Sequence, residues 1–277
     1  MQPPDDLPDD LPNDLPNDLP NDTVTYSLDG HVATITYNRP ERLNAIDGAM
    51  RQALNAAFTR FRDDEDAWVA IVTGAGRAFC AGADLRGEGD PTGEFTGTFW
   101  ERPTVNSFES GWEIFKPVIA AVNGYCIGYG LTLVTWCDFV IASERAEFGF
   151  PEVKIGVPTI VGAIRLPRKI NWQYAMEMLL TGDRIDAARA HEIGLAGWVV
   201  PHDDLLDEAR KLAARLVAAA PLAQRAIKEV ATRSADMGMT EAIRFGETMR
   251  RVANTAQDAA EGRAAAAEKR TPQWKGR

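Results

Sequence analysis

Two glycine-rich stretches of the sequence combine residue types and spacing that suit the binding of an anion. In Lys116–Gly130, an apolar run is followed by glycines at 124, 128 and 130 and then by a helical pattern. In Phe79–Leu85, a shorter loop lies between an apolar run and a possible helix. Glycine lets the backbone approach a ligand closely, and a helix start offers N–H groups at the positive end of its dipole. Both turns therefore predict a site for an oxyanion, although plain packing would also explain either turn taken alone.

The elements that must hold these turns can be predicted from hydrophobic periodicity. Residues Thr23–Tyr37 alternate across an Asp29-Gly30 turn, which predicts a β-hairpin. Residues Asp47–Arg62 carry their apolar side chains on one side of a helix. Short apolar runs predict buried strands at Trp68–Thr73, Val118–Val122 and Phe139–Ala142, and a helix is expected to start within Gly130–Thr135.

Helical periodicity dominates the last third of the chain. Amphipathic helices are expected at Gln173–Leu180, Leu205–Ala219 and Leu222–Arg233, with one long helix over Thr240–Ala267. A short helix is also expected over Phe108–Phe115, after a stretch rich in Gly, Pro and Thr. An α/β core followed by a helical C-terminal region is therefore predicted, with the boundary near residues 201–221.

The formal net charge of −10 is concentrated at the start of the chain. Seven aspartates and no basic residue lie between residues 5 and 22, and residues 6–21 form one Asp-Leu-Pro-Asp and three Asp-Leu-Pro-Asn repeats. A proline in each repeat forbids a helix, and the aspartates repel one another, so residues 1–22 are expected to form a disordered acidic tail. No basic face for nucleic acid is predicted, and an acidic, proline-rich start is no signal peptide.

Several classes of protein are excluded by missing motifs. The sequence has three cysteines, an odd number, and no two of them are two residues apart. Neither a disulfide framework nor a structural zinc site is therefore expected. A reducing, cytoplasmic location is the simplest expectation. The apolar stretch Pro117–Ala142 is broken by glycines and polar residues and does not predict a membrane span. Residues Val72–Arg77 lack the third glycine and the acidic partner of a dinucleotide site, and no Gly-x-Ser-x-Gly elbow occurs.

Six stretches of the sequence together resemble the crotonase (enoyl-CoA hydratase/isomerase) family. They follow the family's order at plausible spacing: Asn38–Ile46, Gly76–Leu85, Lys116–Gly130, Phe148–Gly156, Leu180–Ala187 and Glu268–Pro272. The resemblance implies a spiral core of ββα turns over residues 23–205 and a helical oligomerisation region over 206–277. It implies an acyl-CoA substrate, a homotrimer or a dimer of trimers, and no metal or cofactor besides the coenzyme A thioester.

The resemblance assigns the two oxyanion donors to the backbone N–H groups of Ala83 and Tyr129. Removing a proton beside a thioester creates an enolate oxygen of high energy, and losing one preorganised donor to such an oxygen typically costs about 3–4 kcal/mol. The family usually has glycine where this chain has Tyr129. The tyrosine keeps the N–H and adds a phenol ring, which is expected to narrow or redirect the acyl pocket.

The resemblance also assigns the acid/base. A family hydratase uses two glutamates; one matches Glu152, whereas the other position is Thr132, which has no basic group at neutral pH. A single carboxylate can take a proton from C2 and return it at C4, so the residues favour double-bond isomerisation over hydration. Dehydration, thioester hydrolysis or decarboxylation through the same enolate stays open, as does a non-catalytic acyl-CoA-binding protein.

The expected coenzyme A contacts are less specific. Family positions around the nucleotide match Arg42, Leu43, Ala45, Ala81 and Leu85. Arg86 and, from a neighbouring subunit, Lys269 are expected to meet phosphates as simple cations. Phe99, Trp100 and Trp112 are candidates for the acyl pocket, with core packing as the alternative.

Overall fold

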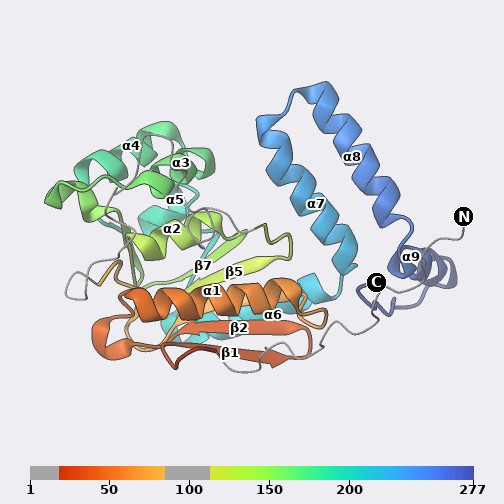
Figure 1. The fold of residues 1–277 in the computed structure, drawn as a ribbon, viewed down its shortest axis with the longest axis horizontal. Helices are drawn as coiled ribbons and strands as arrows, with labels where there is room; N and C mark the ends of the chain where they lie inside the picture. The colour runs from red at the N-terminus through yellow and green to blue at the C-terminus, as the bar shows by residue number, and fades with distance from the viewer. Residues whose placement is uncertain (1–18, 85–112) are drawn as a thin grey trace, which may run out of the picture.

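The computed structural model describes residues 19–84 and 113–277 (Figure 1). Its main element is a six-stranded sheet in the order β1-β2-β3-β5-β7-β10, in which β1 runs antiparallel to β2 and the other neighbouring pairs are parallel. The strands are β1 Val24–Asp29, β2 Val32–Tyr37, β3 Val69–Gly74, β5 Val118–Val122, β7 Phe139–Ser143 and β10 Trp198–Val200. The predicted hairpin and the three predicted buried strands are confirmed.

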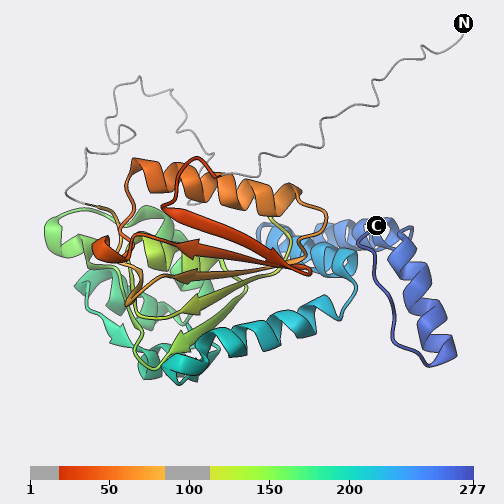
Figure 2. The same cartoon turned by 90° about the horizontal axis from the view of Figure 1, so that it is seen from below.

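Different helices cover the two faces of this sheet (Figure 2). Helix α1 (Gly48–Asp63) lies on one face and helix α6 (Leu205–Val217) on the other. Because successive residues of a strand point to opposite faces, Val72 joins the core that contains α1, whereas Ile71 joins the core that contains α6. Burial on both faces is what a largely parallel sheet requires.

A second, smaller sheet has the order β4-β6-β8-β9. It consists of β4 Ala78–Cys80, β6 Tyr125–Ile127, β8 Glu147–Gly149 and β9 Ile185–Asp186. Strands β4, β6 and β8 are parallel, so their carboxyl ends lie at one edge. The sequence did not predict these strands, because two or three residues are too short to show alternation.

The remaining helices lie around and beyond the two sheets. They are α2 Tyr129–Trp136, α3 Ile160–Lys169, α4 Trp172–Thr181, α5 Ala187–Glu192, α7 Pro221–Arg233, α8 Met239–Ala253 and α9 Gln257–Glu268. Short 3-10 turns are η1 Pro40–Arg42, η3 Pro151–Ile155, η4 His202–Asp204 and η5 Ser234–Asp236. Helices α7 and α8 form a hairpin that projects away from the sheet, and α9 lies at the open end of that hairpin, at the foot of α8 (Figure 1). No helix in the described part of the chain is long and apolar enough to cross a bilayer.

Two helix predictions were wrong in detail. The helix expected over Thr240–Ala267 is interrupted at residues 254–256, where the Thr255 hydroxyl donates to Val252 O at 2.7 Å. Asn and Thr side chains compete with the helical backbone for hydrogen bonds, which favours a break here. Residues 113–115, the described end of the helix expected over Phe108–Phe115, are not helical, and the rest of that helix lies outside the described residues.

Both ends of the described chain contact the folded part. Asn21, within the predicted tail, donates its side-chain amide to Ala49 O at 3.0 Å. At the other end, the buried carboxylate of Asp258 in α9 accepts the backbone N–H groups of Lys275 and Gly276 at 2.7 and 2.9 Å. The Trp274 indole donates to Ala218 O at 2.8 Å, so the last residues fold back toward α6.

Candidate active site

Three of the predicted site residues follow the carboxyl ends of three neighbouring strands of the small sheet. Ala83 follows β4, Tyr129 follows β6 and Glu152 follows β8. Parallel strands bring their carboxyl ends to one edge, which is where ligands of open α/β sheets commonly bind. The local topology therefore gathers the predicted oxyanion donors and the predicted acid/base, although 69 positions separate the first from the last in the sequence.

The backbone of Ala83 is held in a defined orientation by Ile46. The Ile46 N–H donates to Gly82 O at 2.8 Å, and Ile46 O accepts the Asp84 N–H at 2.9 Å. In such a parallel bridge, the N–H of the intervening residue points away from its partner. The Ala83 N–H is thus turned from the Ile46 side, and Ala83 itself is exposed.

Tyr129 is the first residue of α2, so its N–H belongs to the helix turn that lacks intrahelical acceptors. Gly128 precedes it with φ 54° and ψ −115°, a combination that only glycine adopts readily. The half-buried Tyr129 ring lies 4.9 Å from the guanidinium carbon of Arg51 in α1. At the other end of α2, the Lys169 ammonium donates to Val134 O and Cys137 O, which places a cation at the negative end of the helix dipole.

Glu152 lies in the first turn of η3 and is half-buried. Its Oε2 atom is buried and accepts no hydrogen bond from any residue that the structure describes. Its backbone is fixed, because Glu152 O accepts the Val157 N–H at 3.0 Å. A buried carboxylate oxygen without a donor is costly in a folded protein and is available to a substrate proton.

Close contacts of Gly82 and Gly128 show that these elements converge. A Cβ built on Gly128 would lie 2.7 Å from Glu152 Oε1 and 3.6 Å from the Cα of Gly82. A Cβ on Gly82 would lie 3.3 Å from Ile127 O, at the end of β6. The Gly128 N–H also donates to Gly149 O at 3.0 Å, which links α2 to the strand that leads to Glu152. The loop before Ala83, the start of α2 and the Glu152 carboxylate therefore meet at one point.

Thr132 is one turn into α2 and is 4 % exposed. Its N–H donates to Gly128 O at 2.9 Å, and its carbonyl accepts the Thr135 hydroxyl at 2.7 Å. A neutral hydroxyl at this position can orient a polar group, but it cannot remove a proton from water.

Four of the expected coenzyme A residues lie beside the Ala83 loop. Ala81 N–H donates to Leu43 O at 3.0 Å, and Ala45 N–H donates to Arg42 O at 3.0 Å. Leu43 has φ 53°, in the left-handed region that a branched side chain rarely adopts. Residues held in such conformations are often found at ligand contacts.

Two arginines converge on Asp84, the residue after Ala83. Arg42 Nη2 lies 3.0 Å from Asp84 Oδ1, and Arg39 Nη2 lies 3.3 Å from Asp84 Oδ2. Arg39 also pairs with Asp47, the N-cap of α1, at 2.9 Å. In this structure the Arg42 cation expected near the nucleotide is thus already engaged by a carboxylate.

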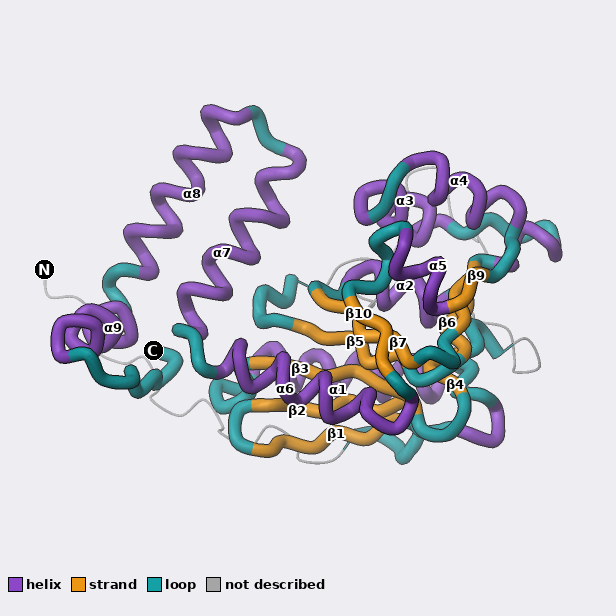
Figure 3. Tube along the Cα trace, turned by 180° about the vertical axis from the view of Figure 1, so that it is seen from behind, coloured by secondary structure: helices purple, strands orange, loops and turns teal. Residues whose placement is uncertain are grey.

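The other predicted ligand contacts are not gathered at this point. Lys269, the C-cap of α9, lies at the opposite end of the molecule from β4 and β6 (Figure 3). Within a single chain it does not reach the site, as expected for a residue assigned to a neighbouring subunit. Leu85, Arg86, Phe99, Trp100 and Trp112 lie outside the described residues.

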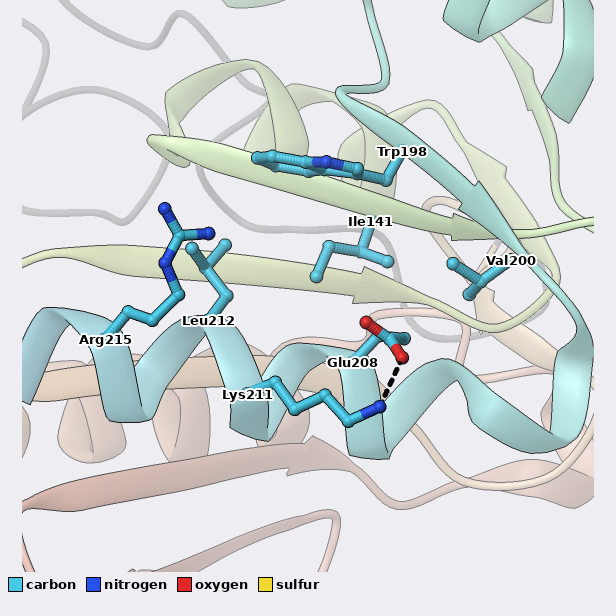
Figure 4. A pocket seen from close by; sticks show the side chains of 7 residues that line it. All are labelled: Ile141, Trp198, Val200, Glu208, Lys211, Leu212 and Arg215. Carbon is cyan, nitrogen blue, oxygen red and sulfur yellow. Dashed lines mark hydrogen bonds and ion pairs between the residues drawn. The ribbon is translucent and has the colours of Figure 1, made fainter.

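Other cavities lie apart from this constellation. A pocket of about 100 Å³ between β10, β7 and α6 is lined by Trp198, Ile141 and Leu212 and by a Lys211–Glu208 ion pair of 2.7 Å (Figure 4). None of the predicted site residues lines it. A larger cavity of about 360 Å³ is lined by apolar side chains that include Val153, the neighbour of Glu152.

Gly82 and Gly128 are individually necessary here, which the sequence did not specify. The glycine-rich turns predicted close backbone approach in general, but not that Gly128 makes room for the Glu152 carboxylate. Asn44 was also missed: it is fully buried, and its amide donates to Ala75 O and Ala78 O at 2.9 and 2.7 Å. The sequence did offer a signal: asparagine tolerates the left-handed conformation that Asn44, directly after Arg42 and Leu43, adopts in the structure.

Comparisons with known proteins agree with this geometry. The family model described as enoyl-CoA hydratase/isomerase matches residues 28–277. A probable mitochondrial enoyl-CoA hydratase of Dictyostelium discoideum is 38% identical over 257 residues, covering 91% of this chain and 90% of that protein. Carnitinyl-CoA dehydratase of Proteus mirabilis is 40% identical over 261 residues, covering 90% and 96%.

A solved structure shows the same fold. The crystal structure of an enoyl-CoA hydratase/isomerase from Mycobacterium paratuberculosis has a TM-score of 0.82 at 39% identity, covering 93% of this chain and 99% of that chain. The predicted crotonase-like α/β architecture is therefore confirmed. With a family model that spans nearly the whole described fold and relatives close to 40% identical, the chain belongs to the enoyl-CoA hydratase/isomerase family of acyl-CoA enzymes.

Proposed function

We propose that this enzyme moves a double bond along an acyl-CoA thioester, through an enolate held by the N–H groups of Ala83 and Tyr129. The single observation that carries the proposal is the Glu152 carboxylate, which lies against Gly128 with one buried oxygen that accepts no hydrogen bond from residues 19–84 or 113–277. It is the acid/base at the point where the two donor loops meet. Thr132 replaces a second carboxylate.

In the proposed reaction, Glu152 removes a proton from C2 of a 3-enoyl thioester. The C–H electron pair forms a double bond between C1 and C2 as the carbonyl π pair moves onto the oxygen, and the resulting dienolate oxygen is stabilised by the two N–H groups. When the carbonyl re-forms, the C1–C2 pair moves to C2–C3 and the C3–C4 pair takes the proton at C4. Glu152, now protonated, returns the proton at C4, which gives the conjugated 2-enoyl thioester. One carboxylate is enough because it acts first as base and then as acid.

Hydration or dehydration is the second candidate, and the relatives favour it. The matched proteins are named as hydratases and as a dehydratase. Glu152 would serve that reaction too, by moving the proton at C2, but water would then need activation by a group other than Thr132.

The two candidates are separated by rates on two substrates. Purified protein is expected to convert 3-enoyl-CoA into 2-enoyl-CoA faster than it hydrates 2-enoyl-CoA. The absorbance of the conjugated thioester rises in the first reaction and falls in the second, so one spectrometer reads both. Rapid hydration without isomerisation would overturn the single-carboxylate argument.

The role of Glu152 is tested by Glu152→Gln. Loss of turnover by at least about 10²-fold is expected for removal of a general acid/base, while acyl-CoA binding, measured by calorimetry, persists. Glu177, an exposed glutamate of α4, provides the matched control Glu177→Gln. Full activity in Glu152→Gln would require a different acid/base.

We propose further that coenzyme A binds along the Arg42–Ala45 and Ala81 backbone, with Leu85, Arg86 and a neighbouring subunit's Lys269 completing the site. Exposed apolar side chains on α7 and α8, among them Ile227 at 69% and Ile243 at 59%, support assembly into a trimer or a dimer of trimers. A cytoplasmic location is supported by three free, buried thiols.

A further inference from the structure

The sulfur of Cys80 lies between the two donor loops. Cys80 ends β4 and is fully buried. The Gly82 N–H donates to its Sγ at 3.4 Å, and the thiol faces Gly82 O at 3.9 Å. The backbone N–H of Gly130, in the first turn of α2, also faces this thiol and acts to lower its pKa. A Cβ built on Gly130 would lie 3.3 Å from that Sγ and 2.8 Å from the Cys80 Cβ, so the helix backbone rests directly on this side chain.

The two N–H groups that converge on the sulfur are next to the two proposed donors in the sequence. Gly82 directly precedes Ala83, and Gly130 directly follows Tyr129. Because each peptide unit is planar, fixing the Gly130 N–H fixes the plane that begins at the Tyr129 carbonyl. Fixing Gly82 likewise limits the rotation that could turn the Ala83 N–H. The Cys80 sulfur therefore constrains both donor loops, the Ala83 loop after β4 and the start of α2 after β6.

We infer that Cys80 is a positioning residue, whose sulfur fastens the Ala83 loop to the first turn of α2 and sets the separation of the two oxyanion donors. This inference rests on the proposed function, because it takes the Ala83 and Tyr129 N–H groups as those donors. Cys80 touches neither substrate nor reacting atoms; it acts through Gly82 and Gly130.

The chemistry of a thiol suits this role. Burial raises the pKa of Cys80 to about 12, so the group is neutral in the working range and adds no negative charge beside a developing enolate. Sulfur is large and reaches two N–H groups that a hydroxyl oxygen on a shorter bond would not reach equally well. Removing the sulfur leaves two buried N–H groups without this acceptor, which favours a local rearrangement.

The test compares Cys80→Ala and Cys80→Ser with the matched control Cys137→Ala, which deletes the same atom from another buried cysteine at the far end of α2. The probe is butyryl-CoA labelled with ¹³C at the thioester carbonyl, whose stretching frequency is read by infrared difference spectroscopy. Strong donors lower this frequency. Turnover is followed with 3-enoyl-CoA.

In wild type and Cys137→Ala, binding is expected to lower the carbonyl frequency to the same extent. In Cys80→Ala, most of this shift is lost and kcat falls by about 10- to 100-fold with KM nearly unchanged, since donors misplaced by a fraction of an ångström stabilise the transition state poorly. In Cys80→Ser, the carbonyl frequency shift and kcat should both lie between those of wild type and Cys80→Ala, because serine keeps a hydrogen-bond acceptor on a shorter side chain.

The outcomes separate this inference from the proposed function. A wild-type frequency shift that persists fully in Cys80→Ala, with unchanged kcat, refutes the positioning role and leaves the oxyanion donors in place. Absence of any shift in the wild type refutes the donors themselves and the proposed function with them. If Cys80→Ala fails to fold, Cys80→Ser alone tests the positioning role. A wild-type carbonyl frequency shift together with a wild-type kcat in Cys80→Ser would contradict the inference.

Discussion

Gly128→Ala isolates the contact between the start of α2 and the Glu152 carboxylate, the proposed acid/base. The new Cβ would lie 2.7 Å from Glu152 Oε1, whereas ordinary contact begins at 3.4 Å, so the oxygen must retreat by about 0.7 Å. Gly128 also has φ 54°, which costs a residue with a Cβ roughly 1–2 kcal/mol. The substitution therefore acts twice, once on stability and once on the position of the acid/base.

The two effects can be estimated separately. A misplacement of about 1 Å at a reacting group can cost about 10²-fold in rate, so a retreat of about 0.7 Å should lower kcat by about 10- to 100-fold. In free energy this is about 1.4–2.7 kcal/mol of transition-state stabilisation. Unfolding free energy should fall by a similar amount, mainly from the left-handed conformation.

Gly194→Ala is the matched control, because Gly194 has φ 82° and a Cβ there would meet nothing within 4 Å. Urea denaturation should show a comparable loss of stability in both variants. Initial rates with 3-enoyl-CoA should fall in Gly128→Ala alone, with acyl-CoA binding retained. Should both variants keep wild-type kcat, Glu152 would not lie against Gly128 in the working enzyme, and the proposed acid/base geometry would be refuted.

Three further predictions concern stability. Asn44→Ala should lower the free energy of unfolding in urea by about 1–3 kcal/mol, because Ala75 O loses the Asn44 amide, whereas Ala78 O keeps the Asn123 amide at 3.2 Å; a loss below about 0.5 kcal/mol would contradict this. Burial lowers the pKa of Lys116 from 10.5 to about 8, so the unfolded chain binds more protons between these values. The free energy of unfolding of the wild type should therefore rise with pH, relative to that of Lys116→Met, across this window. Parallel pH profiles of the two proteins would contradict the lowered pKa of Lys116. Asp258→Ala should release residues 271–277 from α9, because the Lys275 and Gly276 N–H groups lose their acceptor. Limited proteolysis of this segment should then be faster, and an unchanged cleavage pattern would contradict the prediction.

The larger elements could be predicted because their patterns are long. The Thr23–Tyr37 hairpin has twelve strand residues in alternation around an Asp-Gly turn, and α1 shows apolar spacing over four turns. Helix α3 was missed, because Gly162 and Pro167 both argue against a helix. Pro167 is tolerated near the end of α3, and Gly162 is required because a Cβ there would lie 2.6 Å from the Phe150 ring.

The candidate site residues could be named from the sequence, but their assembly could not be predicted. Resemblance to a family identified Ala83, Tyr129 and Glu152, yet no sequence pattern revealed the three short strands that bring them together. The ion pairs of Asp84 with Arg39 and Arg42 depend on tertiary contacts more than 40 positions apart. The coenzyme A contacts at Leu85, Arg86 and Lys269 stay predictions.

The Asp84 ion pairs have a consequence for catalysis. Asp84 directly follows Ala83, one of the two proposed donors, and its side chain is largely buried. An unpaired carboxylate beside the proposed oxyanion site would repel the enolate, since two charges interact more strongly inside a protein than in water. The guanidinium groups of Arg39 and Arg42 cancel that charge, and Asp47 balances the surplus cation. Under the proposed mechanism, the two guanidinium groups would therefore neutralise a buried carboxylate next to the Ala83 donor.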